Sequence, residues 1–160
     1  MESHMHDPFR PKELGVIARK ALMTLRIIWF ALMMGQLVFF AIIVVAILPT
    51  VHPAHVQPML NWVSVAMLIT AAPITFFIRA MIFRRFRAED GVRRAGYCTG
   101  NIVFWAGCET ATFFGLVVAM INGSLWPTIW VVAIALLLQV LTFPTAGGLS
   151  ASEDAVARSG

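Results

Sequence analysis

The sequence predicts an all-α fold, a polytopic four-helix bundle that crosses a membrane. Hydrophobic residues make up 59% of the 160 positions and charged residues only 12%, a composition far outside the range of soluble domains. The apolar residues also gather in long runs, and a spanning helix needs roughly 20 of them to cross a hydrocarbon layer of about 30 Å. We therefore expect one membrane domain over residues 1–160.

Four segments satisfy this length requirement, and helix-breaking residues separate them. The expected spans are residues 25–48, 59–83, 99–121 and 126–143. Pro49, Pro53 and Pro58 fill the first connector, and Asn122-Gly123-Ser124 makes a tight turn between the third and fourth spans. The first span lacks a small-residue cleavage site, so we expect it to stay as a helix and not to act as a signal peptide.

The positions of the twelve Lys and Arg residues predict the orientation of the spans. These residues precede or open the first span, border the connector between the second and third spans, or lie in the tail at 144–160; none lies in residues 49–58 or 122–125. By the positive-inside rule, the N-terminus, the C-terminus and the basic loop at 84–97 are cytoplasmic. We expect a multi-pass protein of the bacterial cytoplasmic (inner) membrane, with the lipid bilayer as partner and no nucleic-acid binding.

Glu109 is the acidic residue that falls inside one of these apolar runs, near the middle of the third span. A carboxyl group at this depth costs several kcal/mol unless it is neutral, paired or faces a polar cavity. No Lys or Arg is expected at the same depth, so desolvation favours the neutral acid. Glu109 is therefore the leading candidate for a functional group.

We expect Gln36 to be the partner of this carboxyl. Gln36 lies about eleven residues into the first span and Glu109 about ten into the third, so at about 1.5 Å per residue they reach nearly equal depth. An amide can donate to a carboxylate or accept from a neutral acid, and Thr112 lies on the same helix face as Glu109. Two interpretations stay open: a neutral acid that holds helices together, or a group that binds and releases a proton or cation.

The third span also carries a strip of small residues. Gly107, Ala111, Gly115 and Ala119 recur every four residues, which allows a neighbouring backbone to approach closely. Glu109 lies about 200° around the helix from Gly107 and points away from this strip. We expect the strip to serve packing within the chain, with an oligomer interface as the alternative.

The remaining residues give little support for catalysis or metal binding. His52 and His55 lie together in the first connector, but two His residues without Cys or carboxylate support make a poor metal site. The sequence has no phosphate-binding Gly-rich loop, no Ser/His/Asp set and no zinc-protease motif. We expect no enzymatic activity, no metal and no cofactor.

Two resemblances extend this interpretation. The run Glu109-Thr-Ala-Thr-Phe-Phe-Gly-Leu-Val-Val-Ala119 resembles the carboxylate helix of the ATP synthase proteolipid, subunit c, which implies that Glu109 is an ion-binding carboxylate. The set Ala31-Leu-Met-Met-Gly-Gln36, Glu109 and Pro144-Thr145 is similar to that of uncharacterised bacterial four-helix integral membrane proteins. That second likeness spans most of the chain and implies a fold and a location, without an activity.

Two functions follow as hypotheses. The first is a structural or accessory role in membrane-protein assembly, with Glu109 and Gln36 as a buried polar centre and a homo-oligomer or another membrane protein as partner. The alternative is a proteolipid-like or small transporter subunit that binds a proton or cation at Glu109.

Overall fold

The computed structural model describes residues 16–50, 57–89 and 91–149, and it confirms the all-α class. Four α-helices make up most of this part of the chain, together with two short helical turns and a small hairpin. In chain order the elements are α1 Val16–Ile42, η1 Ile43–Ile47, α2 Pro58–Arg85, β1 Arg87–Ala88, β2 Gly91–Val92, α3 Arg94–Asn122, α4 Ile129–Leu141 and η2 Ala146–Gly148. The η1 turn is π-helical and continues α1, whereas η2 is a single 3₁₀ turn.

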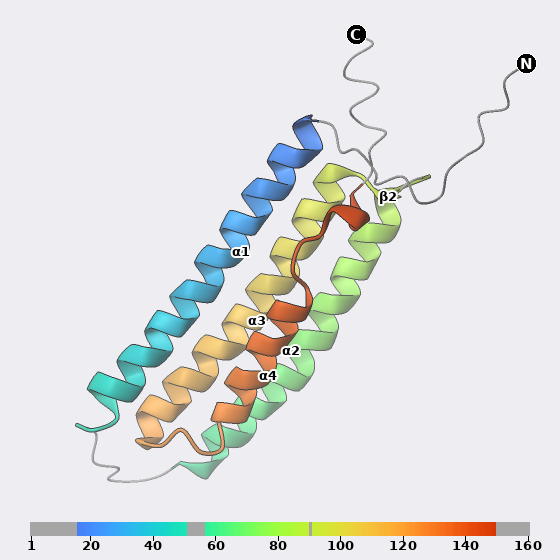
Figure 1. The fold of residues 1–160 in the computed structure, drawn as a ribbon. Coiled ribbons are helices and arrows are strands. Elements are labelled where there is room, and N and C mark those ends of the chain that lie inside the picture. The colour runs from blue at the N-terminus through green and yellow to red at the C-terminus, as the bar shows by residue number, and fades with distance from the viewer. Residues whose placement is uncertain (1–15, 51–56, 90, 150–160) are drawn as a thin grey trace, which may run out of the picture.

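The helices form a bundle in which α3 is central (Figure 1). α1 and α3 run in one direction, and α2 and α4 run back in the other. α3 packs against α1, α2 and α4, and half of its most apolar 18-residue window is buried, compared with 11% for α1 and 6% for α2. The outer helices therefore contribute mostly surface, and α3 contributes most of the core.

Three helices are long and apolar enough to cross a membrane: Ala18–Ile47, Pro58–Arg85 and Arg94–Asn122. The expected fourth span over residues 126–143 is shorter, because α4 has only 13 residues, a length of about 20 Å. Pro144 lies just beyond the end of α4 and disfavours helical backbone in the residue before it. From Thr142 to Leu149 the chain continues without α-helix, apart from the η2 turn.

Local chemistry explains the other helix ends. Pro58 is the first residue of α2, where its missing N–H removes no helical hydrogen bond. Gly123 follows α3 with a φ of 59°, the left-handed conformation that favours glycine at a helix C-terminus. Between α2 and α3, β1 and β2 pair antiparallel, with Arg87 opposite Val92. This hairpin was not predicted from the sequence.

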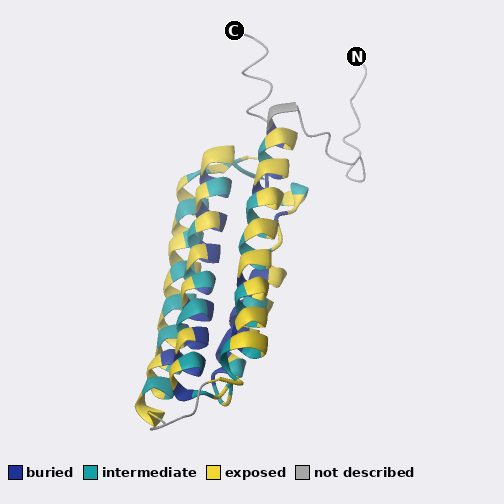
Figure 2. Ribbon diagram, turned by 90° about the vertical axis from the view of Figure 1, so that its left-hand side faces the viewer, coloured by how far each residue is buried: buried dark blue, intermediate teal, exposed yellow. Residues whose placement is uncertain are grey.

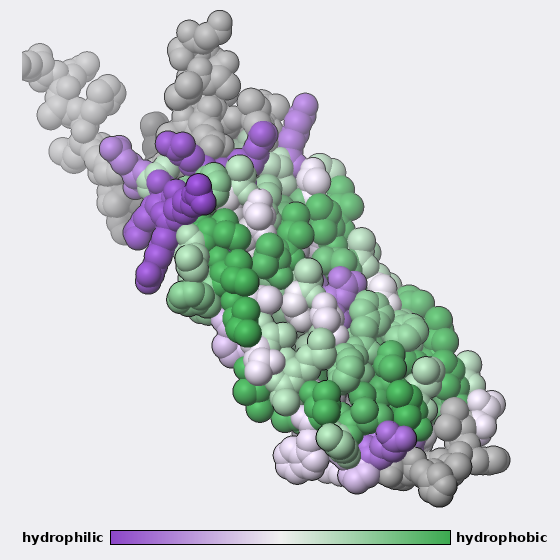
Figure 3. Space-filling model, turned by 180° about the vertical axis from the view of Figure 1, so that it is seen from behind, coloured by the Kyte–Doolittle hydropathy of each residue, from purple (hydrophilic) through white to green (hydrophobic). Residues whose placement is uncertain are grey.

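The surface divides into a long apolar body and a charged end. Exposed residues cover the outer faces of the helices (Figure 2), and many are large and hydrophobic, including Phe30, Trp62 and Phe77. Exposed arginines crowd the hairpin end, here called the basic end (Figure 3). Its members are Arg84, Arg85, Arg87, Arg93 and Arg94. An apolar surface of this extent suggests a membrane protein.

Candidate functional site

Glu109 lies at the edge of the outward face of α3. Exposed positions recur on this helix at residues 102, 106, 110, 117 and 121, and Glu109, which is half-buried, borders this row. Within the part of the chain that the structure describes, no hydrogen bond or ion pair reaches its carboxyl group. The acid therefore sits on the flank of the bundle and not among the polar groups of its interior.

On α1, the residue at about the depth of Glu109 is Gly35, which has no side chain to contact the carboxyl group. The rings of Phe39 and Phe113 meet edge to face with centroids 5.2 Å apart. Because α1 and α3 run in the same direction, one turn back from this contact brings Gly35 and Glu109 to about the same depth. Gly35 is exposed, and no atom lies within 4 Å of the position that a Cβ would take. The surface around Gly35 is open.

Gln36 turns to a different partner, so the expected hydrogen bond between Gln36 and Glu109 is wrong. Its Nε2 donates to Oε1 of Gln139 on α4 at 2.8 Å, and both side chains are fully buried. Successive helical residues differ by about 100° around the axis, so Gln36 faces the interior while Gly35 faces outward. The equal depth of Gln36 and Glu109 allowed the expected hydrogen bond, but the rotation of α1 about its axis directs the Gln36 side chain to α4.

This amide pair uses only part of its hydrogen-bonding capacity. Oε1 of Gln36 and Nε2 of Gln139 have no partner although both are buried. The backbone oxygen of Gln139 accepts a hydrogen bond of 2.9 Å from Nε1 of Trp29, so α1 holds the last turn of α4 through two side chains. Gln139 was missed in the sequence, although it is the one polar residue of α4.

Two side chains of α3 also hold the segment after α4. Nε1 of Trp105 donates to Oγ1 of Thr142 at 3.1 Å. The hydroxyl of Tyr97 donates to the backbone oxygen of Thr145 at 3.0 Å and accepts from its N–H at 3.1 Å. Non-helical backbone is tolerated at membrane depth where protein groups satisfy it. These contacts explain how α4 can end early.

Thr112, which was predicted to belong to the polar centre, takes a structural position. Thr112 is fully buried, and its hydroxyl donates to the backbone oxygen of Cys108 in its own helix at 3.0 Å. It therefore contacts neither Glu109 nor Gln36 through a hydrogen bond. The polar groups of the interior therefore form hydrogen bonds that hold the helices together, and Glu109 on the flank takes no part in them.

The small-residue strip of α3 lies against two helices of the same chain. A Cβ at Gly107 would lie 2.5 Å from Cγ2 of Thr75 on α2. Ala111 belongs to a core cluster with Leu68 of α2 and residues of α4. The Cβ position of Gly115 is 3.4 Å from Val132 on α4, and Ala119 is buried.

Comparisons with known protein families, with curated proteins and with solved structures find no match for this chain. The two resemblances noted above therefore rest on the sequence alone. His52 and His55, considered as a metal pair, lie outside the described residues.

The geometry thus separates two kinds of polar group. The interior amides and hydroxyls bond to other helices or to backbone, which suits them to hold the bundle together. The Glu109 carboxyl can accept as an anion, or donate and accept as a neutral acid. This carboxyl group is available to bind a group that lies outside the described bundle, such as a side chain of another protein or a cation.

Proposed function

We propose that this chain is a structural or accessory membrane protein that offers Glu109 to a polar group of another protein within the bilayer. The observation that carries this proposal is the position of Glu109, half-buried beside the outward face of α3 and without a hydrogen-bond partner in the described residues. In hydrocarbon no water replaces a missing partner, so such a group favours association with a protein that supplies one.

The partner that fits is a spanning helix with a hydroxyl, amide or basic side chain near the bilayer midplane. A neutral acid can bond to a hydroxyl or an amide in either direction, and a basic group would stabilise the carboxylate instead. The chain itself sits in the bacterial inner membrane with both termini and the hairpin in the cytoplasm. The clustering of arginines at the basic end supports this orientation.

Proton or cation binding by Glu109 is the second candidate. The half-exposed position beside an outward face also supports it, because an ion-binding carboxyl must be reachable from a neighbouring subunit or an aqueous path. The resemblance of residues 109–119 to the proteolipid carboxylate helix points the same way. The two candidates differ in what Glu109 binds: a polar side chain of another protein, or a proton or cation.

Photo-crosslinking tests the accessory role. A crosslinking amino acid replaces Thr110, which is exposed on the same face, in the full-length chain in its own membrane. We expect one discrete crosslinked protein, retained in Glu109→Gln because the amide keeps hydrogen-bonding capacity, and lost in Glu109→Leu. The matched control carries the crosslinker at Ile69, an exposed site on α2, and should not capture that protein.

Ion flux through the purified chain in liposomes distinguishes ion binding from the accessory role. If the purified chain conducts protons or cations in liposomes and Glu109→Gln abolishes that flux, ion handling replaces the accessory role. An unchanged crosslinking pattern in Glu109→Leu would also contradict docking at this residue.

A further inference from the structure

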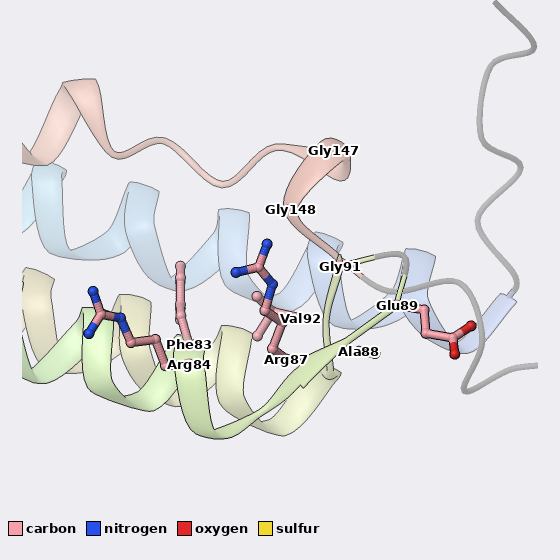
Figure 4. Close-up of a pocket in the computed structure, with 9 residues that line it drawn as sticks. All are labelled: Phe83, Arg84, Arg87, Ala88, Glu89, Gly91, Val92, Gly147 and Gly148. Atoms are coloured by element: carbon pink, nitrogen blue, oxygen red, sulfur yellow. The ribbon is translucent and has the colours of Figure 1, made fainter. Parts of the chain in front are cut away.

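The basic end contains a hollow that none of the preceding functions uses. It has a volume of about 420 Å³ and is lined by the C-terminal end of α2, the hairpin and the η2 turn (Figure 4). Arg84 and Arg87 provide its cationic groups, Glu89 is the acidic residue of its lining, and Phe83 and Val92 provide apolar surface. The hollow therefore combines positive charge with an apolar wall.

The two arginines have no anionic partner in the described part of the chain. Both are exposed, and within the described residues neither forms an ion pair with a carboxylate. Figure 4 shows the Arg87 side chain extending toward the Gly147 and Gly148 segment, with Phe83 between the two guanidinium groups. The Glu89 side chain lies on the opposite side of the hairpin from both and points away. Because two arginines and one glutamate line the hollow, its described lining carries a net positive charge.

A third arginine, Arg79, lies against the ring of Phe83, one of the residues that line the hollow. The Arg79 guanidinium sits 4.9 Å from the ring centroid of Phe83 and 5.6 Å from that of Phe104. Its Nε is buried without a hydrogen-bond partner. A charge in such surroundings is poorly screened by water, so Arg79 adds positive potential beside Phe83. Within the described residues no carboxylate pairs with Arg79, so an anion in the hollow would offset part of this charge.

We propose that this hollow binds the phosphate-bearing headgroup of an anionic membrane lipid. Guanidinium groups match phosphate in geometry and charge, and basic pockets at the cytoplasmic ends of spanning helices suit anionic headgroups. Phe83 and Arg84 belong to α2, a helix long and apolar enough to span, so the hollow lies at the level where headgroups are concentrated. A lipid is favoured over a soluble phosphate for that reason.

Native mass spectrometry of the full-length chain in neutral detergent tests this site. The probes are phosphatidylglycerol and phosphatidylcholine with identical acyl chains, each titrated separately. The pocket variant Arg84→Gln/Arg87→Gln is compared with Arg85→Gln/Arg93→Gln, which removes the same charge from exposed arginines of the basic end that do not line the hollow. The unsubstituted chain should bind the first phosphatidylglycerol more tightly than phosphatidylcholine.

We expect the pocket variant to lose at least about tenfold more phosphatidylglycerol affinity than the control variant, because charge-assisted hydrogen bonds to phosphate are lost. The difference should persist at about 1 M salt, where a Debye length near 3 Å removes the long-range contribution. The variant Arg84→Lys/Arg87→Lys keeps the charge but lacks the planar guanidinium groups, so its loss of phosphatidylglycerol affinity should be between those of the control variant and the pocket variant. It also replaces the pocket variant if the glutamine substitutions prevent folding.

Three outcomes would overturn the proposal. Equal losses in the two double variants would indicate general surface charge. Equal binding of both lipids by the unsubstituted chain would remove the preference for an anionic headgroup. Binding of inorganic phosphate alone, dependent on Arg84 and Arg87 and without lipid retention, would assign the hollow to a soluble anion.

Discussion

The side-chain amide of Gln36 donates a hydrogen bond of 2.8 Å to that of Gln139 and so ties the C-terminal part of α1 to the last turn of α4. Trp29 adds a second bond from α1 to the backbone oxygen of Gln139. α1 otherwise contributes little buried surface. These two polar contacts therefore give α1 a defined rotation and hold the end of a helix that is too short to span.

The Gln36–Gln139 pair should show energetic coupling. Gln36→Leu and Gln139→Leu each leave a buried amide without a partner, and we expect each to lower the free energy of unfolding by about 1–3 kcal/mol. The double variant should lose less than the sum, with a coupling of about 0.6 kcal/mol or somewhat more, as for polar pairs in membrane proteins. Reversible unfolding in detergent measures this. The matched pair Gln36→Leu and Glu109→Leu should be additive within about 0.5 kcal/mol.

Gly107 should be intolerant of even one added methyl group. A Cβ there would meet the Thr75 side chain at 2.5 Å, so Gly107→Ala should destabilise the bundle by about 1–3 kcal/mol through overpacking. Gly35→Ala is the control, because the same change enters open space on α1 and should be neutral or slightly stabilising. Thr75→Ala should partly rescue Gly107→Ala. Equal unfolding temperatures for Gly107→Ala and Gly35→Ala would contradict close packing of α3 on α2.

Tyr97 should control the segment after α4. Tyr97→Phe keeps the ring stacked on Phe83, whose centroid lies 5.7 Å away, but removes the hydroxyl that both donates to and accepts from Thr145. Loss of about 1–2 kcal/mol of local stabilisation should speed amide exchange of Thr145 by roughly fivefold to thirtyfold. Hydrogen exchange of residues 142–149 measures this, with the Ser124 amide as the unaffected reference. Unchanged exchange would show that other contacts hold the segment.

The proposed orientation predicts a labelling pattern. Gln57 and Glu89 are exposed and lie at opposite ends of the bundle, at the start of α2 and in the hairpin. A membrane-impermeant maleimide applied to intact cells should label Gln57→Cys and not Glu89→Cys, because positive loops stay in the cytoplasm. The unsubstituted chain gives the background from Cys98 and Cys108. The reverse pattern would invert the topology.

Glu109 should be a neutral acid at pH 7 when the chain is alone in a bilayer. It has no hydrogen-bond or ionic partner in the described residues, and hydrocarbon disfavours the charged form. Infrared difference spectroscopy should show a protonated carboxyl band that disappears in Glu109→Gln, while Glu89→Gln in the exposed hairpin leaves it unchanged. A carboxylate signal lost with Glu109→Gln would show the anion instead.

Several features of the fold were predictable because they depend on short stretches of sequence. Apolar runs of about twenty residues predicted α1, α2 and α3, since only helices satisfy their own backbone in hydrocarbon. The breaks at Pro58 and Gly123 followed from the conformations these residues prefer. The early end of α4 was less evident, because residues 142 and 143 are compatible with a helix. Hydrogen bonds from Trp105 and Tyr97 of α3 to Thr142 and Thr145 stabilise the non-helical backbone instead.

The sequence by itself determined how many apolar helices form, where the charges gather and that Glu109 is an acid among apolar residues. Tertiary structure alone decided the partners of the polar residues. Gln36 reaches nearly the same depth as Glu109 by residue count, but depth leaves the rotation of each helix about its axis free. The contacts of α1 with the rest of the bundle, among them the bonds of Trp29 and Gln36 to Gln139, set that rotation, whereas Glu109 lies on the outer flank.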